Sequence, residues 1–180
     1  MRYFFILTIL FITGCNRPSG LASLKEQIKN ELGKNEGTFA VAFKDLQTGD
    51  TLLINARQNF HAASTMKTPV MIEVYKQVAQ GKLSLSDSID VKNEFHSIVD
   101  GSLYQLDLGD DSEQDLYAQV GSKQTLANLV YEMIIVSSNL ATNIVIELVD
   151  AKKVTETMRT LGAMDIQVLR GVDDGKAFEQ

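Results

Sequence analysis

The sequence predicts a mixed α/β fold of the α+β type, in which helices and a small antiparallel sheet occupy separate stretches of the chain. The pattern of a helix is followed by that of a β-hairpin, and further helical patterns come after it. Of the 180 residues, 44% are hydrophobic and 22% are charged, which is ordinary for a globular domain. A helix next to a hairpin implies a helix that lies on a sheet.

Residues 1–14 have the features of a secretory signal. Arg2 precedes the apolar run 3–12, which is too short to cross a bilayer, because a membrane helix needs about 20 apolar residues. The sequence Ile-Thr-Gly before Cys15 resembles the lipobox of bacterial lipoproteins, whose cysteine is lipidated and becomes the mature N-terminus. The alternative is a plain signal peptide that leaves one cysteine.

We therefore expect a signal over residues 1–14, a lipid-anchored tether over 15–20 and one domain over 21–180. The protein would be exported and attached to a bacterial membrane through Cys15, in the periplasm or at the cell surface. Cys15 is the single cysteine, so disulfides and clusters of cysteine ligands are excluded. The net charge of −6 and the absence of a basic patch exclude a nucleic-acid partner.

The first elements of the domain are a helix and a hairpin. Leu21, Leu24, Ile28 and Leu32 recur at helical spacing, and Gly33 ends the pattern. Alternating apolar residues over 38–46 and the run 51–54 flank a Gly-containing turn, which is typical of a β-hairpin.

The later elements are mostly helical. Apolar periodicity predicts helices over 64–79, 125–136, 140–149 and 152–161. The stretch 96–121 is polar, acidic and weakly periodic, so we expect it to lie on the surface outside the core.

Ser64 and Lys67 are the first candidate for chemistry. Residues three apart share a helix face, so their side chains are expected to meet. A serine becomes a nucleophile when a neighbouring base takes its proton, and a lysine with a lowered pKa is such a base. Unpaired N–H groups at the helix start, that of Ser64 among them, could stabilise an oxyanion. The alternative is that Ser64 only caps the helix.

Ser137 and Asn139 form the second candidate group. They lie in a break between two apolar helices, where side chains are not needed for packing. Serine and asparagine are also common at such boundaries as caps, so this pair by itself is weak evidence. The combination with Ser64 and Lys67 favours a catalytic site.

These motifs resemble those of the class A β-lactamases and related penicillin-binding proteins, which carry S-x-x-K, S-D-N and K-T-G. Phe60 and Thr65 also agree with the family's pattern around the nucleophile, and the resemblance extends from Leu21 to the end of the chain. It implies a β-lactamase/transpeptidase-like fold over 21–180, with an all-α lobe and an antiparallel sheet lobe flanked by helices.

The resemblance also implies a role for each matching residue. Ser64 would be acylated by the β-lactam carbonyl, and Lys67 would take or relay its proton. Ser137 would pass a proton to the departing nitrogen, while Asn139 would bind the amide side chain of the substrate.

Two departures from the family pattern bear on the function. Ser138 replaces the aspartate of S-D-N, which removes a carboxylate that braces this loop. The sequence contains no K-T-G, so the sheet is expected to be incomplete and the chain to be a truncated fragment, with inactivity of this fragment as an open alternative. The deacylating glutamate is assigned to Glu179, with Asp173 and Asp174 as alternatives on the same polar loop.

The predicted function is that of a class A-like serine β-lactamase acting on β-lactam antibiotics. The alternatives are a penicillin-binding D-alanyl-D-alanine peptidase, which acts on peptidoglycan peptides, and a non-hydrolytic β-lactam sensor or cell-wall-binding lipoprotein. No cofactor is implied and a monomer is expected. No acidic or cysteine residue stands at metal-ligand spacing from His61 or His96, so no metal site is predicted.

Overall fold

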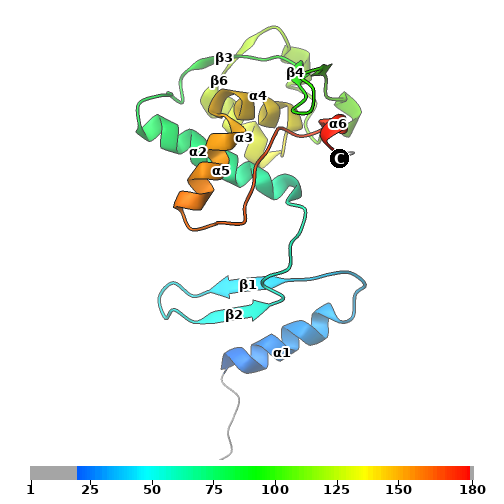
Figure 1. Cartoon of the computed structure of the whole chain (residues 1–180), viewed down its shortest axis with the longest axis vertical. Helices are drawn as coiled ribbons and strands as arrows, with labels where there is room; N and C mark the ends of the chain where they lie inside the picture. Colours follow the sequence, from blue (N-terminus) through cyan, green and yellow to red (C-terminus); the bar gives the residue numbers. More distant parts are fainter. Residues whose placement is uncertain (1–19, 179–180) are drawn as a thin grey trace, which may run out of the picture. The chain divides into compact units, whose positions relative to one another are not determined.

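A computed structural model of the chain describes residues 20–178. The chain divides after His61 into two compact units (Figure 1). The predicted signal over 1–14 and Cys15 lie outside the described residues, as does Glu179. Within the described range, no helix has both the length and the apolar composition needed to cross a bilayer.

The first unit consists of a helix and a β-hairpin, which confirms the prediction for this part of the chain. Helix α1 covers Gly20–Leu32. Strand β1 (Val41–Lys44) pairs antiparallel with β2 (Thr51–Ile54), and β1 starts three residues later than its sequence pattern. Helix α1 packs against β2.

The hairpin is shaped by its turn and by one apolar face. The Oδ1 atom of Asp45 accepts hydrogen bonds from the backbone N–H groups of Gln47 (2.7 Å) and Thr48 (3.1 Å), which fixes the tight turn. Leu52 and Ile54 alternate with exposed residues along β2 and are buried. This alternation is the period of a strand with one covered face.

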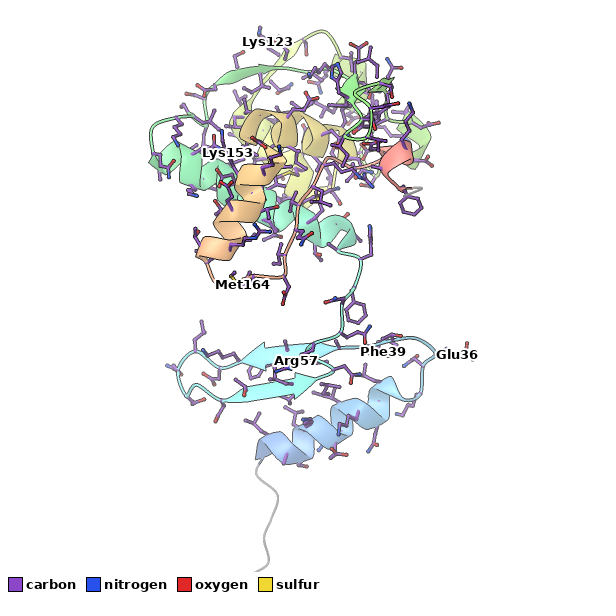
Figure 2. All side chains as sticks on the ribbon, viewed as in Figure 1. Glu36, Phe39, Arg57, Lys123, Lys153 and Met164 are labelled. Atoms are coloured by element: carbon purple, nitrogen blue, oxygen red, sulfur yellow. The ribbon has the colours of Figure 1, made fainter. Side chains whose placement is uncertain are left out.

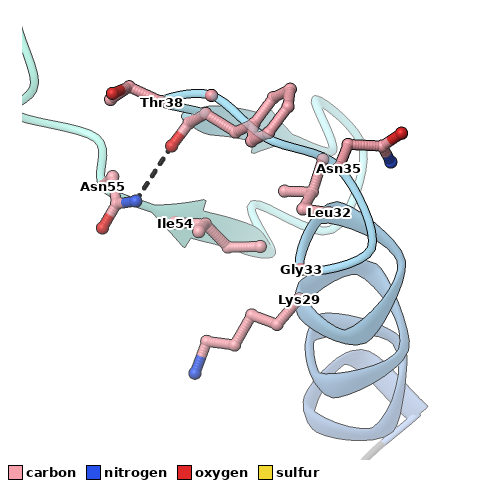
Figure 3. A pocket seen from close by; sticks show the side chains of 9 residues that line it. Lys29, Leu32, Gly33, Asn35, Thr38, Ile54 and Asn55 are labelled. Atoms are coloured by element: carbon pink, nitrogen blue, oxygen red, sulfur yellow. Dashed lines mark hydrogen bonds between the residues drawn. The ribbon is translucent and has the colours of Figure 1, made fainter.

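A shallow hollow of about 320 Å³ lies between the end of α1 and the hairpin (Figure 3). The side-chain amide of Asn55 donates a hydrogen bond to the carbonyl of Phe39 (2.9 Å) at its edge. Lys29 is its charged residue and pairs with Glu26 (3.0 Å) on the surface of α1. None of the candidate residues Ser64, Lys67, Ser137 and Asn139 lines this hollow.

The second unit is built mainly from helices, at the positions that the apolar periodicity predicts. Its α-helices are α2 (Lys67–Ala79), α3 (Leu126–Ile135), α4 (Asn139–Val149), α5 (Ala151–Thr160) and α6 (Gly175–Phe178), and the 3₁₀ helix η1 (Ala63–Met66) leads into α2. Helix α4 packs against α2, α3 and α5, and α2 also packs against α5. The short helix α6 was not predicted.

Short strands complete the second unit. Strand β3 (Ser88–Asp90) pairs antiparallel with β6 (Lys123–Thr125), and β4 (Phe95–His96) pairs with β5 (Leu103–Tyr104). In the described part of the chain, β-structure is thus limited to three separate two-stranded pairs. The expected incomplete sheet is confirmed.

Most of the stretch 96–121 lies outside the core, as predicted, but the prediction is wrong at a few positions. Two 3₁₀ turns, η2 (Leu108–Asp110) and η3 (Tyr117–Gln119), give this stretch local order. Leu106 and Leu116 are buried and belong to the core cluster, and Asp111 is buried as well. These few apolar residues follow no helix or strand period, so the sequence pattern did not reveal their packing.

The core of the second unit surrounds α4. Eight of its eleven residues are buried, which suits a helix that is apolar on nearly all sides. Charged and long side chains such as those of Lys123, Lys153 and Met164 lie at the surface instead (Figure 2). The N-terminus of this rigid helix carries Asn139, so the packing fixes the position of the S-x-N motif. The core residues with no more than 1% exposure are Val70, Val74, Val91, Leu116, Leu126, Leu129, Met133, Leu140, Ala141, Val145, Val149 and Val154.

A buried polar network connects α2 with α4 and α5. Glu73 is only 2% exposed, and its carboxylate accepts hydrogen bonds from Gln77 (2.8 Å) and from the Thr157 hydroxyl (2.5 Å). Lys76 donates to the same Thr157 hydroxyl (2.5 Å), and Gln77 also donates to the carbonyl of Val149 (3.0 Å). The network satisfies the polar atoms that these helices bury.

Replacing Glu73 with alanine is expected to lower the free energy of unfolding by roughly 3 kcal/mol, because the donors of Gln77 and Thr157 lose a buried acceptor. Urea denaturation followed by circular dichroism would measure this change. Glu156→Ala, an exposed glutamate on α5, is the matched control and is expected to change the value by less than about 0.5 kcal/mol. Equal effects of the two substitutions would contradict a stabilising role for the network.

Candidate active site

Ser64 lies in the 3₁₀ turn η1 that leads into α2, one turn before the α-helix itself begins at Lys67. The backbone of Ala63 has a positive φ of 45°, which is rare for an alanine and sets the direction of this turn. Pro69 lies in the first turn of α2, where its missing N–H is not needed. The side chain of Ser64 is exposed, whereas Lys67 is only 2% exposed.

The ammonium group of Lys67 donates hydrogen bonds to three acceptors. These are the Ser137 carbonyl oxygen (2.5 Å), the Ser137 Oγ (2.9 Å) and the Asn139 Oδ1 (2.9 Å). An ammonium has three N–H donors, so each donor has one partner. Lys67 therefore ties the start of α2 to the turn between α3 and α4.

Ser137 connects Lys67 with the predicted nucleophile. Its Oγ is 2.9 Å from Lys67 Nζ and 3.0 Å from Ser64 Oγ, so the three groups form one hydrogen-bonded chain. The backbone of Ser137 has a positive φ of 60°, an unfavourable conformation for a residue with a Cβ. Such strain is common at functional sites, where the surrounding contacts hold it in place.

The arrangement can move a proton from Ser64 to Lys67. A hydroxyl both donates and accepts, so Ser137 can pass its own proton to a neutral Lys67 while taking one from Ser64. Burial lowers the pKa of Lys67, which favours the neutral form that can accept a proton. The carboxylates of Asp111 and Asp173 oppose this shift.

On sequence alone, Ser64 and Lys67 were expected to meet directly on one helix face. The hydrogen bonds connect them through Ser137 instead, because the Lys67 side chain points to the α3–α4 turn. All four described residues with a predicted role, Ser64, Lys67, Ser137 and Asn139, nevertheless lie in one hydrogen-bonded group.

Asn139 has a second charged neighbour. Its Nδ2 donates to the Asp173 carboxylate at 3.3 Å, while its Oδ1 accepts from Lys67. Burial raises the pKa of Asp173, and the nearby carboxylates of Asp110 and Asp111 add to the shift. Of the acids considered for deacylation, Asp173 thus contacts this group. Asp174 is buried elsewhere and accepts a hydrogen bond from the backbone N–H of Ile98 (3.0 Å).

The loop that carries Asp173 is attached to α4 by Asn143, which was missed in the sequence. Asn143 Oδ1 accepts from the Val172 N–H (2.6 Å), and its Nδ2 donates to the Val172 carbonyl (3.0 Å). A Cβ added at Gly171 would come within 2.3 Å of Asn143 Oδ1, so only glycine permits this close approach. The available signal was the spacing: Asn143 lies four residues after Asn139, on the same helix face.

Ser138 and Asp111 both act at the start of α4. Ser138 Oγ accepts from the Ala141 N–H (3.1 Å), which is a typical helix cap. Asp111 accepts from the N–H groups of Asn139 and Leu140. The carboxylate that S-x-N lacks at position 138 is therefore present here, and it comes from the polar stretch 96–121.

The other two residues with a predicted role, Cys15 and Glu179, lie outside the described residues. Across residues 20–178, no group of three or more His, Cys, Asp or Glu side chains is placed to hold a metal ion.

Comparison with known proteins identifies the family. A sequence model described as the Beta-lactamase enzyme family matches residues 23–180, almost the whole chain. The chain belongs to this family. The resemblance to the β-lactamase family that the sequence motifs indicate is thus confirmed. No curated protein matches this family member.

Three solved structures show the fold of this family member. A β-lactamase from Sphaerobacter thermophilus is 29% identical, with a TM-score of 0.64 over 86% of this chain and 52% of that chain. PBP-A is 23% identical, with a TM-score of 0.70 over 87% of this chain and 55% of that one. An ancestral class A β-lactamase of Gram-negative bacteria is 24% identical, with a TM-score of 0.67 over 84% and 54%. The chain thus spans about half the length of these structures, and the predicted β-lactamase/transpeptidase-like fold is confirmed.

Proposed function

We propose that the protein is a class A-like serine β-lactamase that opens the β-lactam ring through an acyl-enzyme on Ser64. The observation that carries the proposal is the hydrogen-bonded chain from Lys67 through Ser137 to Ser64. It places a buried lysine with a lowered pKa one hydroxyl away from an exposed serine. This is the arrangement that nucleophilic catalysis requires.

Acylation begins when Ser64 Oγ attacks the lactam carbonyl carbon. The Ser64 proton passes to Ser137 as the Ser137 proton passes to neutral Lys67, and the C–O bond forms. The carbonyl electron pair moves to oxygen, where the backbone N–H of Ser64 can stabilise the charge. When the C–N bond breaks, Ser137 gives its proton to the lactam nitrogen and recovers one from the Lys67 ammonium. The products of this step are the Ser64 ester and a neutral Lys67.

Deacylation requires a water molecule that attacks the Ser64 ester, with a carboxylate as its general base. We assign this role to Glu179, as the sequence pattern suggests. Asn139 would bind the amide side chain of the substrate. Its contact with Asp173 then has to open when the substrate enters.

The substrate class that we expect is inferred from a protein of similar structure. A variant of PBP-A, 22% identical to this chain, was solved as an acyl-enzyme complex with penicillin G. By analogy, we expect a small β-lactam to be the substrate of this protein, with no cofactor. Export and lipid attachment at Cys15 complete the proposal, and labelling with a radioactive fatty acid, lost in Cys15→Ala, would test the anchor.

A second candidate is a penicillin-binding peptidase, which shares the acylation step but releases the acyl group slowly from β-lactams. One observation favours it: of the acids considered for deacylation, the described one that contacts the site, Asp173, is hydrogen-bonded to Asn139 and not to Ser64. A non-hydrolytic sensor would also keep its acyl group. The three functions therefore differ in how long the ester on Ser64 lasts.

Time-resolved mass spectrometry of the full-length protein with penicillin G separates these functions. We expect an adduct on Ser64 that forms and then disappears as hydrolysed penicillin accumulates. An adduct that persists would favour the peptidase or the sensor. The lack of any adduct would contradict every covalent function, and unmodified penicillin in the mixture would show that no turnover had occurred.

A further inference from the structure

Asp111 makes an unusually dense set of contacts with the turn that carries Ser137. Its Oδ1 accepts from the backbone N–H groups of Asn139 (2.9 Å) and Glu113 (3.2 Å). Its Oδ2 accepts from Asn139 (2.9 Å), from the Leu140 N–H (2.9 Å) and from the Tyr117 hydroxyl (3.0 Å). Asp111 is only 7% exposed, so these bonds are shielded from competing water.

The turn needs such a partner for two reasons. The first N–H groups of a helix have no acceptor within it, and the Ser138 side chain provides for Ala141 only. Asp111 provides for Asn139 and Leu140, and its negative charge suits the positive end of the α4 dipole. The strained backbone of Ser137 directly precedes this point and depends on its neighbours for support.

Ser112, the next residue along the chain, holds the other side of the same turn. Its Oγ lies 2.8 Å from the carbonyl oxygen of Val136 and 3.1 Å from that of Ser137. The Ser137 carbonyl is also an acceptor for the Lys67 ammonium. Asp111 and Ser112 together therefore contact both the donors and the acceptors of the turn, and they hold it where Lys67 binds it.

Asp111 also acts on Lys67 through its charge. Lys67 faces two carboxylates, Asp111 on the polar stretch and Asp173 on the C-terminal loop, and both raise its pKa against the larger lowering effect of burial. The other groups around its ammonium, Ser137 and Asn139, are neutral acceptors. The charge of Asp111 thus helps to decide at which pH Lys67 becomes a base.

We propose that Asp111 is a positioning residue for the acylation reaction, which supplies from a separate segment the carboxylate that Ser138 cannot provide. It holds Ser137 and Asn139 against Lys67 and stabilises the lysine as an ammonium. The proposal rests on the proposed acylation of Ser64. It concerns how the catalytic groups are held and not which groups react.

The test compares Asp111→Asn with Asp115→Asn, which removes an equal charge from an exposed position four residues further on. The rate of Ser64 acylation by a fluorescent penicillin is measured from about pH 5 to about pH 10, a range in which a lysine with a lowered pKa changes its charge. For Asp111→Asn we expect the maximal rate to fall roughly tenfold or more, because hydrogen bonds to a charged group are lost. We also expect the rising limb to move to lower pH, since the lysine has lost a carboxylate. Asp115→Asn is expected to match the wild type.

A rescue variant separates positioning from a general loss of structure. Asp111→Asn with Ser138→Asp restores a carboxylate at the same helix end and is expected to regain at least part of the rate. If Asp111→Asn does not fold, Ser112→Ala tests the same turn from its exposed side, where a lower maximal rate is again expected. An unchanged rate and pH profile in Asp111→Asn, or in Ser112→Ala if it is used, would overturn the proposal.

A measurement without turnover distinguishes this proposal from the proposed function. Carbon-13 NMR of labelled lysines gives the pKa of Lys67 directly, with Lys67→Met identifying its signal. We expect Asp111→Asn to lower this pKa, because the ammonium loses a nearby opposite charge. If the wild type forms no adduct but Asp111→Asn still lowers the pKa of Lys67, the proposed function fails while the interaction between Asp111 and Lys67 is supported. An unchanged Lys67 pKa would overturn the role of Asp111.

Discussion

Ser64→Ala is expected to abolish acylation by penicillin G while leaving the fold intact. The substitution removes the Oγ atom that forms the ester in the proposed reaction, and the Ser137 hydroxyl that lies 3.0 Å from it keeps its hydrogen bond to Lys67. Because the Ser64 side chain is exposed, the free energy of unfolding should change by less than about 0.5 kcal/mol. Mass spectrometry after incubation with penicillin G measures the adduct, and urea denaturation measures the stability.

Ser86→Ala is the matched control for this experiment. Ser86 is exposed in the same unit, and its hydroxyl pairs with that of Ser84 (2.8 Å), away from the hydrogen-bonded group around Lys67. The control should form the adduct at the wild-type rate. An adduct on the Ser64→Ala protein would show that another nucleophile reacts, and it would then be mapped by peptide digestion.

Lys67→Met is expected to give the second-largest loss, about 100- to 10,000-fold in the acylation rate, which is the usual contribution of a general base. Methionine has a similar length and no charge, so it fills the buried space of Lys67 but cannot accept a proton. It also leaves the Ser137 carbonyl and Asn139 without their donor. Stopped-flow measurement with a chromogenic cephalosporin would give the rate.

The direction in which the acylation rate changes with pH also follows from the role of Lys67. Neutral Lys67 is the form that accepts the proton, so the acylation rate of the wild type should rise with pH through the pKa of Lys67. Burial places that limb below the ordinary range for a lysine. In Lys67→Met the limb should disappear. Lys82→Met, which changes an exposed lysine after the end of α2, should keep both rate and limb. A limb that persists in Lys67→Met would assign the base to another group.

The helices and the hairpin could be predicted because their apolar residues are periodic. Residues such as Leu126, Leu129 and Met133 recur at helical spacing and are buried on one face of α3. The burial of Leu106 and Leu116 within the stretch 96–121 was missed because both are isolated among polar residues, and their burial depends on partners distant in the sequence. The bonds of Asp111 to α4 have the same cause: they join residues 28 and 29 positions apart.

Motif spacing was enough to identify Ser64, Lys67, Ser137 and Asn139 as candidate site residues. Their connections could not be predicted in this way, because they depend on the folded chain. Ser64 and Lys67 are three residues apart, yet the proton path between them runs through Ser137, 70 residues beyond Lys67. A buried ammonium is costly unless its N–H groups are hydrogen-bonded, and the acceptors of Lys67 lie at the turn before α4. Asp111 stabilises this turn from the polar stretch 96–121, whose sequence pattern is typical of a surface segment.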